Sequence, residues 1–184
     1  HANAEREAAA QLAALKPHRI ISIERPGLAE DGRYYNMRGR DISDRCAIFD
    51  YYVTAGSCPS IAIGDGGNEI GMGNVADAVA SLAIRGATTT CDELLVADVS
   101  NWGAYGLIAL LDRLTGVPLL GAIDHDALLR YLSDRGSVDG VTGENTLSED
   151  GLPAAAGSEI LQTLAALLRE NPGGTGEHQE STAS

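Results

Sequence analysis

The chain has 184 residues, enough for one domain with a substantial core. Its formal net charge is −13, from 26 acidic and 13 basic residues, which argues against a nucleic-acid partner because the phosphate backbone would be repelled. No apolar stretch is long enough for a membrane helix and no secretory leader opens the sequence, so we expect a soluble cytoplasmic protein without a membrane partner.

The amino-acid composition also limits which kinds of core and which kinds of reaction the chain can support. Hydrophobic residues make up 44% of the chain and aromatic residues only 4%, which predicts an aliphatic, alanine-rich core. Lys16 is the one lysine beside twelve arginines, a bias typical of a GC-rich bacterial genome, and it leaves little room for lysine-based chemistry. Cys46, Cys58 and Cys91 show no CxxC spacing, so we expect buried free thiols in a reducing compartment.

The first quarter of the chain predicts a helix, a strand, a loop and a second helix. An apolar stripe runs along residues 2–15, and Pro17 ends that helix. Ile20–Ile23 is typical of a short buried strand. A polar, arginine-rich loop follows over residues 24–44, longer than most connections need, and a helix is expected over residues 43–52.

A glycine-rich segment follows the second predicted strand, Ile61–Ile63. Five glycines lie between Gly64 and Gly73, and a helix is expected over residues 75–84 with Asn74 as its cap. The third strand is expected over residues 94–99, before the sequence SNWGAYG. Later helices are predicted over residues 107–114, from Asp124 to Ser133 and along an apolar stripe up to Leu168, and residues 171–184 are expected to be disordered.

This order of elements predicts an α/β fold. Short apolar strands separated by helices indicate a Rossmann-like, mostly parallel sheet with helices on both faces, in a single domain over residues 1–170. Ligands of such sheets bind beyond the carboxyl ends of the strands. The loops that follow Ile23, Ile63 and Val99 should therefore meet at one site.

Carboxylates stand directly after two of these strands. Asp65 comes two residues after Ile63, with Asn68 and Glu69 close behind, and Glu24 directly follows the first strand. Such a set suits a hard divalent cation such as Mg²⁺ or Mn²⁺, or a general acid and base. The alternative is that Asp65 and Asn68 only accept hydrogen bonds from turn amides.

A nucleotide is not expected in the glycine-rich loop. The dinucleotide spacing G-x-G-x-x-G fails from Gly64, because its third glycine would fall on Glu69. Its G-x-G-x-x-A variant fits Gly71, Gly73 and Ala76, but it begins too far from the strand. A P-loop is excluded because no G-K-[ST] occurs.

The remaining polar candidates each have two interpretations. Arg33, Arg38 and Arg40 could hold a substrate carboxylate, or form a solvated basic loop. Asn101 stands at a helix start, where capping is the usual role. His125 lies between two aspartates at a helix start, and we expect it at the surface.

Three motifs in this order, ERPG…DGRYYNMRGRDIS, IGDGGNEIGMGNV and DVSNWGAYGL, resemble the glutamate cyclase-like family. The likeness runs from about Pro17 to Leu168. It implies a lyase that dehydrates D-glutamate, or a related amino dicarboxylate, to 5-oxoproline. The family domain begins with further strand–helix units, so the resemblance implies that this fold lacks its first units and that a missing N-terminal half, or a second copy of the chain, is a partner.

The resemblance also implies roles for individual residues. Asp65 and Glu69 would be metal ligands or the acid/base pair, with Glu24 as base or further ligand. The other expected catalytic or substrate-binding residues are Asn68 for positioning, Arg38 for the α-carboxylate, Asn101 for the oxyanion, and Tyr35, Asn36, Gly66 and Gly67 around the substrate. A divalent cation, Mn²⁺ or Mg²⁺, is the expected cofactor. The alternative function is a Rossmann-like module that binds an acidic metabolite or nucleotide without catalysis.

Overall fold

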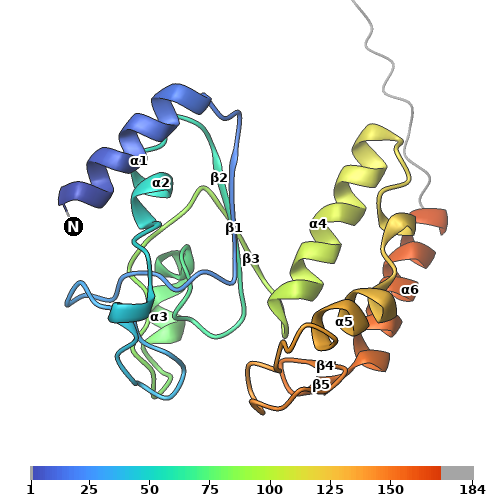
Figure 1. Cartoon of the computed structure of the whole chain (residues 1–184). Helices are drawn as coiled ribbons and strands as arrows, with labels where there is room; N and C mark the ends of the chain where they lie inside the picture. Colours follow the sequence, from blue (N-terminus) through green and yellow to red (C-terminus); the bar gives the residue numbers. More distant parts are fainter. Residues whose placement is uncertain (1, 171–184) are drawn as a thin grey trace, which may run out of the picture. The chain divides into compact units, whose positions relative to one another are not determined.

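The computed structural model describes residues 2–170 of the chain (Figure 1). The predicted tail, residues 171–184, lies outside this part. The helices and strands are α1 (Ala2–Leu15), β1 (Ile20–Ile23), η1 (Ser43–Arg45), α2 (Asp50–Thr54), β2 (Ser60–Gly64), η2 (Met72–Val75), α3 (Ala76–Val79), β3 (Glu93–Val96), α4 (Ser100–Thr115), η3 (Leu120–Ala122), α5 (His125–Ser133), β4 (Ser148–Glu149), β5 (Leu152–Pro153) and α6 (Ala154–Glu170).

A three-stranded parallel sheet in the order β1-β2-β3 organises the first part of the chain. The central strand β2 is the most buried of the three, because Ala62 and Ile63 are at most 1% exposed. Helices flank the sheet, and α1 and α2 lie side by side against each other (Figure 1). The mixed α/β, Rossmann-like fold class is therefore confirmed.

The three predicted strands and the first helix agree with the structure to within a few residues. Lys16 leaves α1 with a positive φ of 47° and Pro17 follows it, which is where the sequence placed the end of the helix. The predicted helix over residues 43–52 is shorter than expected. It is divided into the turn η1 and the five-residue helix α2.

The predicted helix over residues 75–84 is largely wrong. Only η2 and the four-residue α3 form there, and Asn74 does not cap them. Its side chain instead pairs with the backbone of Cys91: Oδ1 accepts the Cys91 N–H at 3.0 Å and Nδ2 donates to the Cys91 carbonyl at 2.9 Å. The Asn74 side chain thus bonds to a segment distant in sequence instead of capping a helix.

Contacts group the chain into two compact units, which divide between Ala104 and Tyr105. The first holds the parallel sheet. The second contains most of α4 together with α5, α6 and the hairpin β4-β5, and α4 begins seven residues earlier than predicted. The single domain over residues 1–170 stays a prediction.

The helix α5 begins and ends as its sequence predicts. Asp124 Oδ1 accepts the Ala127 N–H at 2.9 Å, and Gly136 takes a φ of 82° after the last turn. The placement of His125 at the surface was wrong, because its side chain is 4% exposed. Its Nδ1 lies 3.0 Å from the Tyr105 hydroxyl and its Nε2 lies 3.6 Å from Glu149 Oε1, so buried polar neighbours on both sides hold the ring inside the second unit.

None of the helices between residues 2 and 170 is long and apolar enough to cross a membrane. The three cysteines are free thiols, as expected, but they are half-buried rather than fully buried.

Candidate functional site

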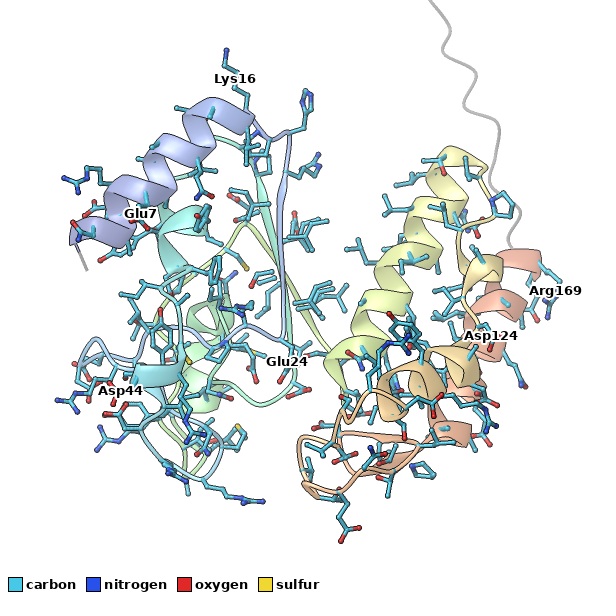
Figure 2. All side chains as sticks on the ribbon, viewed as in Figure 1. Glu7, Lys16, Glu24, Asp44, Asp124 and Arg169 are labelled. Atoms are coloured by element: carbon cyan, nitrogen blue, oxygen red, sulfur yellow. The ribbon has the colours of Figure 1, made fainter. Side chains whose placement is uncertain are left out.

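Three carboxylates meet where β1 and β2 end. One oxygen each from Glu24, Asp65 and Glu69 lies within 4.8 Å of the others. Glu24, labelled in Figure 2 at the end of β1, is exposed, Asp65 is half-buried and Glu69 is 2% exposed. The sequence placed these residues after neighbouring parallel strands, and the structure brings them together.

A short backbone ladder joins the two loops that carry these acids. The Gly27 N–H donates to the Asn68 carbonyl at 2.8 Å, and the Ile70 N–H donates to the Arg25 carbonyl at 2.8 Å. Pro26 and Glu69 are opposite each other between these two bonds. Glu24 precedes the ladder with a left-handed φ of 52°, a strained conformation for a residue other than glycine. The ladder therefore fixes Pro26, two residues after Glu24, beside Glu69, while the Glu24 N–H donates to the Ile63 carbonyl at 3.0 Å.

Glu69 is a buried acid held by its own loop. Its Oε2 accepts the Gly67 N–H at 2.8 Å and its Oε1 accepts the Gly66 N–H at 3.2 Å. Burial raises the pKa of the Glu69 carboxyl above its ordinary value, and the neighbouring Asp65 charge acts in the same direction, while these N–H groups oppose the shift. Glu69 can therefore hold a proton at a higher pH than an exposed glutamate.

Asp65 is oriented by the third loop. Its Oδ2 accepts the backbone N–H of Ser100, the first residue of α4, at 3.0 Å. Hydrogen bonding at a helix N-terminus favours a negative charge. All three loops that the sequence predicted to converge thus contribute to one small region.

Two glycines show why this loop is rich in them. Gly67 has a φ of 104°, where side chains are strained, and a Cβ there would lie 2.9 Å from Ile84 Cδ1. Gly73 packs directly on the Thr88 carbonyl group, and its N–H donates to the Thr89 carbonyl at 3.1 Å. The glycines serve the turn and the close backbone packing. The N–H groups of Gly66 and Gly67, expected around the substrate, donate to Glu69.

The arginine-rich loop docks on the glycine-rich one through Tyr35. The Asn68 Nδ2 donates to the Tyr35 carbonyl at 2.8 Å. The Tyr35 hydroxyl donates to Asp31 at 2.6 Å, so this side chain braces its own loop. Asn36 Oδ1 accepts the N–H groups of Arg38 and Arg40, both at 3.0 Å, which is a turn-forming role.

The side chains of Arg38 and Asn101 are exposed. Arg38 lies in the arginine-rich loop and Asn101 in the first turn of α4, next to the residue that anchors Asp65. The substrate roles of both residues stay predictions.

Two buried polar oxygen atoms of these loops have no hydrogen-bond partner. They are Asn68 Oδ1 and Ser100 Oγ. Such atoms cost free energy when they are left unsatisfied, so they are often completed by a ligand or water. Together with the three carboxylates, they supply only oxygen donors. This chemistry fits a hard divalent cation, as the sequence led us to expect.

Residues 2–165 match a family model described as D-glutamate cyclase-like, C-terminal. The chain belongs to this family. The glycine-rich motif and the acidic cluster lie inside the matched range, so the resemblance inferred from the motifs is confirmed.

A human relative, D-glutamate cyclase, mitochondrial, is 41% identical to the chain over 100 residues. The match covers 50% of this chain and 16% of the human protein. The chain thus corresponds to a small part of that relative's length, and what the whole relative does is not by itself shown for this chain.

Asp50, which the sequence did not reveal as important, connects three segments of the first unit through its buried side chain. Its side chain is 2% exposed and accepts hydrogen bonds from the Leu28 N–H at 2.9 Å, from the Tyr34 hydroxyl at 2.6 Å and from the Thr89 hydroxyl. Burial, followed by the Asp50 contact, raises the pKa of Tyr34 far above its ordinary value. These donors lie up to 39 residues away in sequence, so no local pattern signalled the role.

Proposed function

We propose that the chain is a glutamate cyclase-like lyase, which dehydrates D-glutamate or a related amino dicarboxylate to 5-oxoproline. Membership of the D-glutamate cyclase-like family supports the reaction class. The single observation that supports a catalytic site is the meeting of Glu24, Asp65 and Glu69 within 4.8 Å at the ends of parallel strands.

The chemistry requires acids and bases at one place. Ring closure forms a bond from the α-nitrogen to the carbon of the γ-carboxyl group and breaks a C–O bond at that carbon. Two protons leave the ammonium nitrogen and end on the departing oxygen, which leaves as water. A site for this reaction must therefore accept protons on one side of the substrate and deliver them on the other.

The acidic cluster offers groups of both kinds. Glu69 can be the proton donor, because burial raises its pKa and keeps its protonated form available at higher pH. Glu24, which is exposed, can accept the proton from nitrogen. Asp65 is held in place by the Ser100 N–H and so presents a charge of fixed orientation.

As the alternative to the acid and base roles, ionised Asp65 and Glu69 would hold Mn²⁺ or Mg²⁺, with Glu24 as a further ligand. Such an ion would supply Lewis-acid polarisation of the γ-carboxyl group. We assign the α-carboxylate to Arg38, whose guanidinium can bind it with two parallel hydrogen bonds, and the developing oxyanion to Asn101. Arg38 is exposed in the arginine-rich loop, and Asn101 is exposed in the first turn of α4.

The decisive experiment compares the wild-type chain with Asp65→Asn. Each protein is incubated with D-glutamate and with Mn²⁺ or Mg²⁺, and 5-oxoproline is measured by mass spectrometry. We expect the substitution to reduce product formation by at least about 100-fold, because a charge is lost from the site, with a melting temperature within about 2 °C of wild type. Full activity in Asp65→Asn would refute the catalytic role.

The second candidate is a binding module without catalysis, which holds an acidic metabolite or a nucleotide. Two buried polar atoms without partners, on Asn68 and Ser100, favour some ligand under either hypothesis. A thermal-shift screen with D-glutamate, L-glutamate, 5-oxoproline and nucleotides, each with and without Mn²⁺, separates the two. Stabilisation without product indicates the module, and metal-dependent stabilisation together with product indicates the enzyme.

We also propose a cytoplasmic location, which the three free thiols support. The expected partner, a further N-terminal segment or a second copy of the chain, stays a prediction. Gel filtration with light scattering measures whether the chain self-associates.

A further inference from the structure

A cavity in the first unit lies beside Arg25. Its volume is about 390 Å³, and its walls are mostly apolar. The residues that matter here are Ile20, Arg25, Phe49, Tyr52, Val53 and Ile70. They come from β1, from the α2 region and from the ladder between the two site loops, so three separate segments build the cavity.

This cavity lies on the other side of the ladder from Glu69. Pro26 and Glu69 are opposite each other, and Arg25 and Ile70 form the next pair along, joined by the 2.8 Å bond from the Ile70 N–H to the Arg25 carbonyl. Side chains of successive residues in such a ladder point to opposite faces. Arg25 and Ile70 both line the cavity, whereas Glu69 faces the acidic cluster. The cavity is therefore a separate site.

The charge of Arg25 lacks an ion-pair partner. Its Nε is buried and has no hydrogen-bond acceptor, and its guanidinium lies 4.3 Å from the centre of the Phe49 ring. Of the ion pairs found within residues 2–170, none includes Arg25. The buried carboxylate of Asp50 already accepts three hydrogen bonds. A guanidinium without an ion-pair partner in a mostly apolar wall favours binding of an anion.

We propose that this cavity binds a small organic monocarboxylate with an apolar body, aliphatic or aromatic. The carboxylate accepts hydrogen bonds from the Arg25 guanidinium, and the body packs on Ile20, Val53 and Ile70. A single arginine and apolar walls suit one negative charge on a hydrophobic molecule better than a phosphate or a dicarboxylate, which needs more donors. The proposal is independent of the chemistry assigned to the acidic cluster.

The test uses 3-phenylpropionate and its neutral amide, 3-phenylpropionamide, as probes. Isothermal titration calorimetry and thermal shift are measured on the wild-type chain, on Arg25→Gln and on Arg19→Gln, a control at an exposed arginine. We expect the acid to bind the wild-type chain and to raise its melting temperature, and the amide to bind at least about tenfold more weakly. Arg25→Gln should bind the acid at least about tenfold more weakly than the wild type, whereas Arg19→Gln should keep wild-type affinity.

A second variant, which keeps Arg25, tests the proposal even if Arg25→Gln fails to fold. In Val53→Phe the phenyl ring occupies part of the cavity. We expect this variant to lose binding of the acid, while its circular dichroism spectrum stays like that of the wild type. The proposal is overturned if acid and amide bind equally, if Arg25→Gln or Val53→Phe binds the acid like the wild type, or if 3-phenylpropionate shows no binding at millimolar concentration.

Discussion

Glu69 is a carboxylate that the fold buries and then surrounds with its own backbone donors. It is 2% exposed, and the N–H groups of Gly66 and Gly67 point at its oxygens. The glycines therefore make a nest for a charged side chain of the chain itself, and the carboxylate stays close to Asp65 and Glu24. At the scale of the residue, the same glycines form the turn and hold the Glu69 carboxylate in the acidic cluster.

Gly67→Ala tests this link. The substitution should lower the free energy of unfolding by about 1–3 kcal/mol, because a side chain is strained at a φ of 104° and its Cβ would lie 2.9 Å from Ile84 Cδ1. Urea unfolding followed by circular dichroism measures the change. Gly106→Ala is the control: it lies within α4 with open space around its Cα, so stability should stay equal or rise by up to about 1 kcal/mol. Equal losses in both variants would contradict the explanation.

At the scale of elements, the loop before β4 is organised by one buried acid. Asp139 accepts the N–H groups of Val141, Thr142 and Gly151, each at 2.9 Å, and the Ser148 hydroxyl at 2.7 Å. These bonds, with that of Thr142 the largest cause, hold the pKa of Asp139 well below its usual range. One side chain thus closes a loop in which residues 140–147 are all exposed.

Asp139→Asn should destabilise the chain by about 2 kcal/mol at neutral pH, because the amide cannot accept all four hydrogen bonds. A lowered pKa gives stability that is present above the unfolded value, about pH 4, and is lost as the pH falls below it. Thermal unfolding from pH 6 to pH 2.5 should therefore show a smaller loss in the variant than in the wild type. Parallel curves would show that Asp139 does not cause the acid sensitivity.

Packing of α6 depends on a residue without a side chain. Gly157 lies against His125 and Glu149, and a Cβ there would be 2.6 Å from His125 Nε2 and would also press on Glu149 Oε1. The same group includes Tyr105, and burial, with the Glu149 charge as a smaller cause, raises the pKa of its hydroxyl to about 12. A small residue on α6 is what allows this polar group to be enclosed.

We expect Gly157→Ala to cost about 2–3 kcal/mol of unfolding free energy, since buried groups with fixed neighbours cannot move aside easily. Guanidinium unfolding measures it. Gly121→Ala, at a position with open space in η3, should change stability by less than about 1 kcal/mol. A Gly157→Ala protein as stable as the wild type would mean that the His125 and Glu149 side chains move aside at little cost in free energy.

At the scale of the whole molecule, α4 connects the two compact units. The helix begins at Ser100 in the first unit and continues to Thr115 in the second. Helix formation is cooperative, so melting of one part favours melting of the rest. We therefore predict a single calorimetric transition for the chain, with equal calorimetric and van't Hoff enthalpies. Two resolved transitions would contradict the single domain predicted over residues 1–170.

Much of the fold could be predicted because its signals are local. Apolar runs in Ile20–Ile23 and Ile61–Ile63 predicted strands, and the Asp124 cap predicted the start of α5. The helix expected over residues 75–84 failed because Asn74 binds the backbone of Cys91, and His125 was misplaced because its buried partners come from other elements. Contacts between distant segments override local preference in both cases.

The sequence by itself determined the parallel α/β class, the family and the position of acids directly after strands, because strand order and spacing decide which loops share an edge of the sheet. Only the tertiary structure decided that Glu24 joins Asp65 and Glu69, that the glycine N–H groups serve Glu69, and that Asp50 braces the loops behind them. The first and the last of these facts depend on contacts between residues tens of positions apart, which no pattern along the chain encodes. The second depends on a turn that brings the Glu69 side chain back to glycines two and three residues before it.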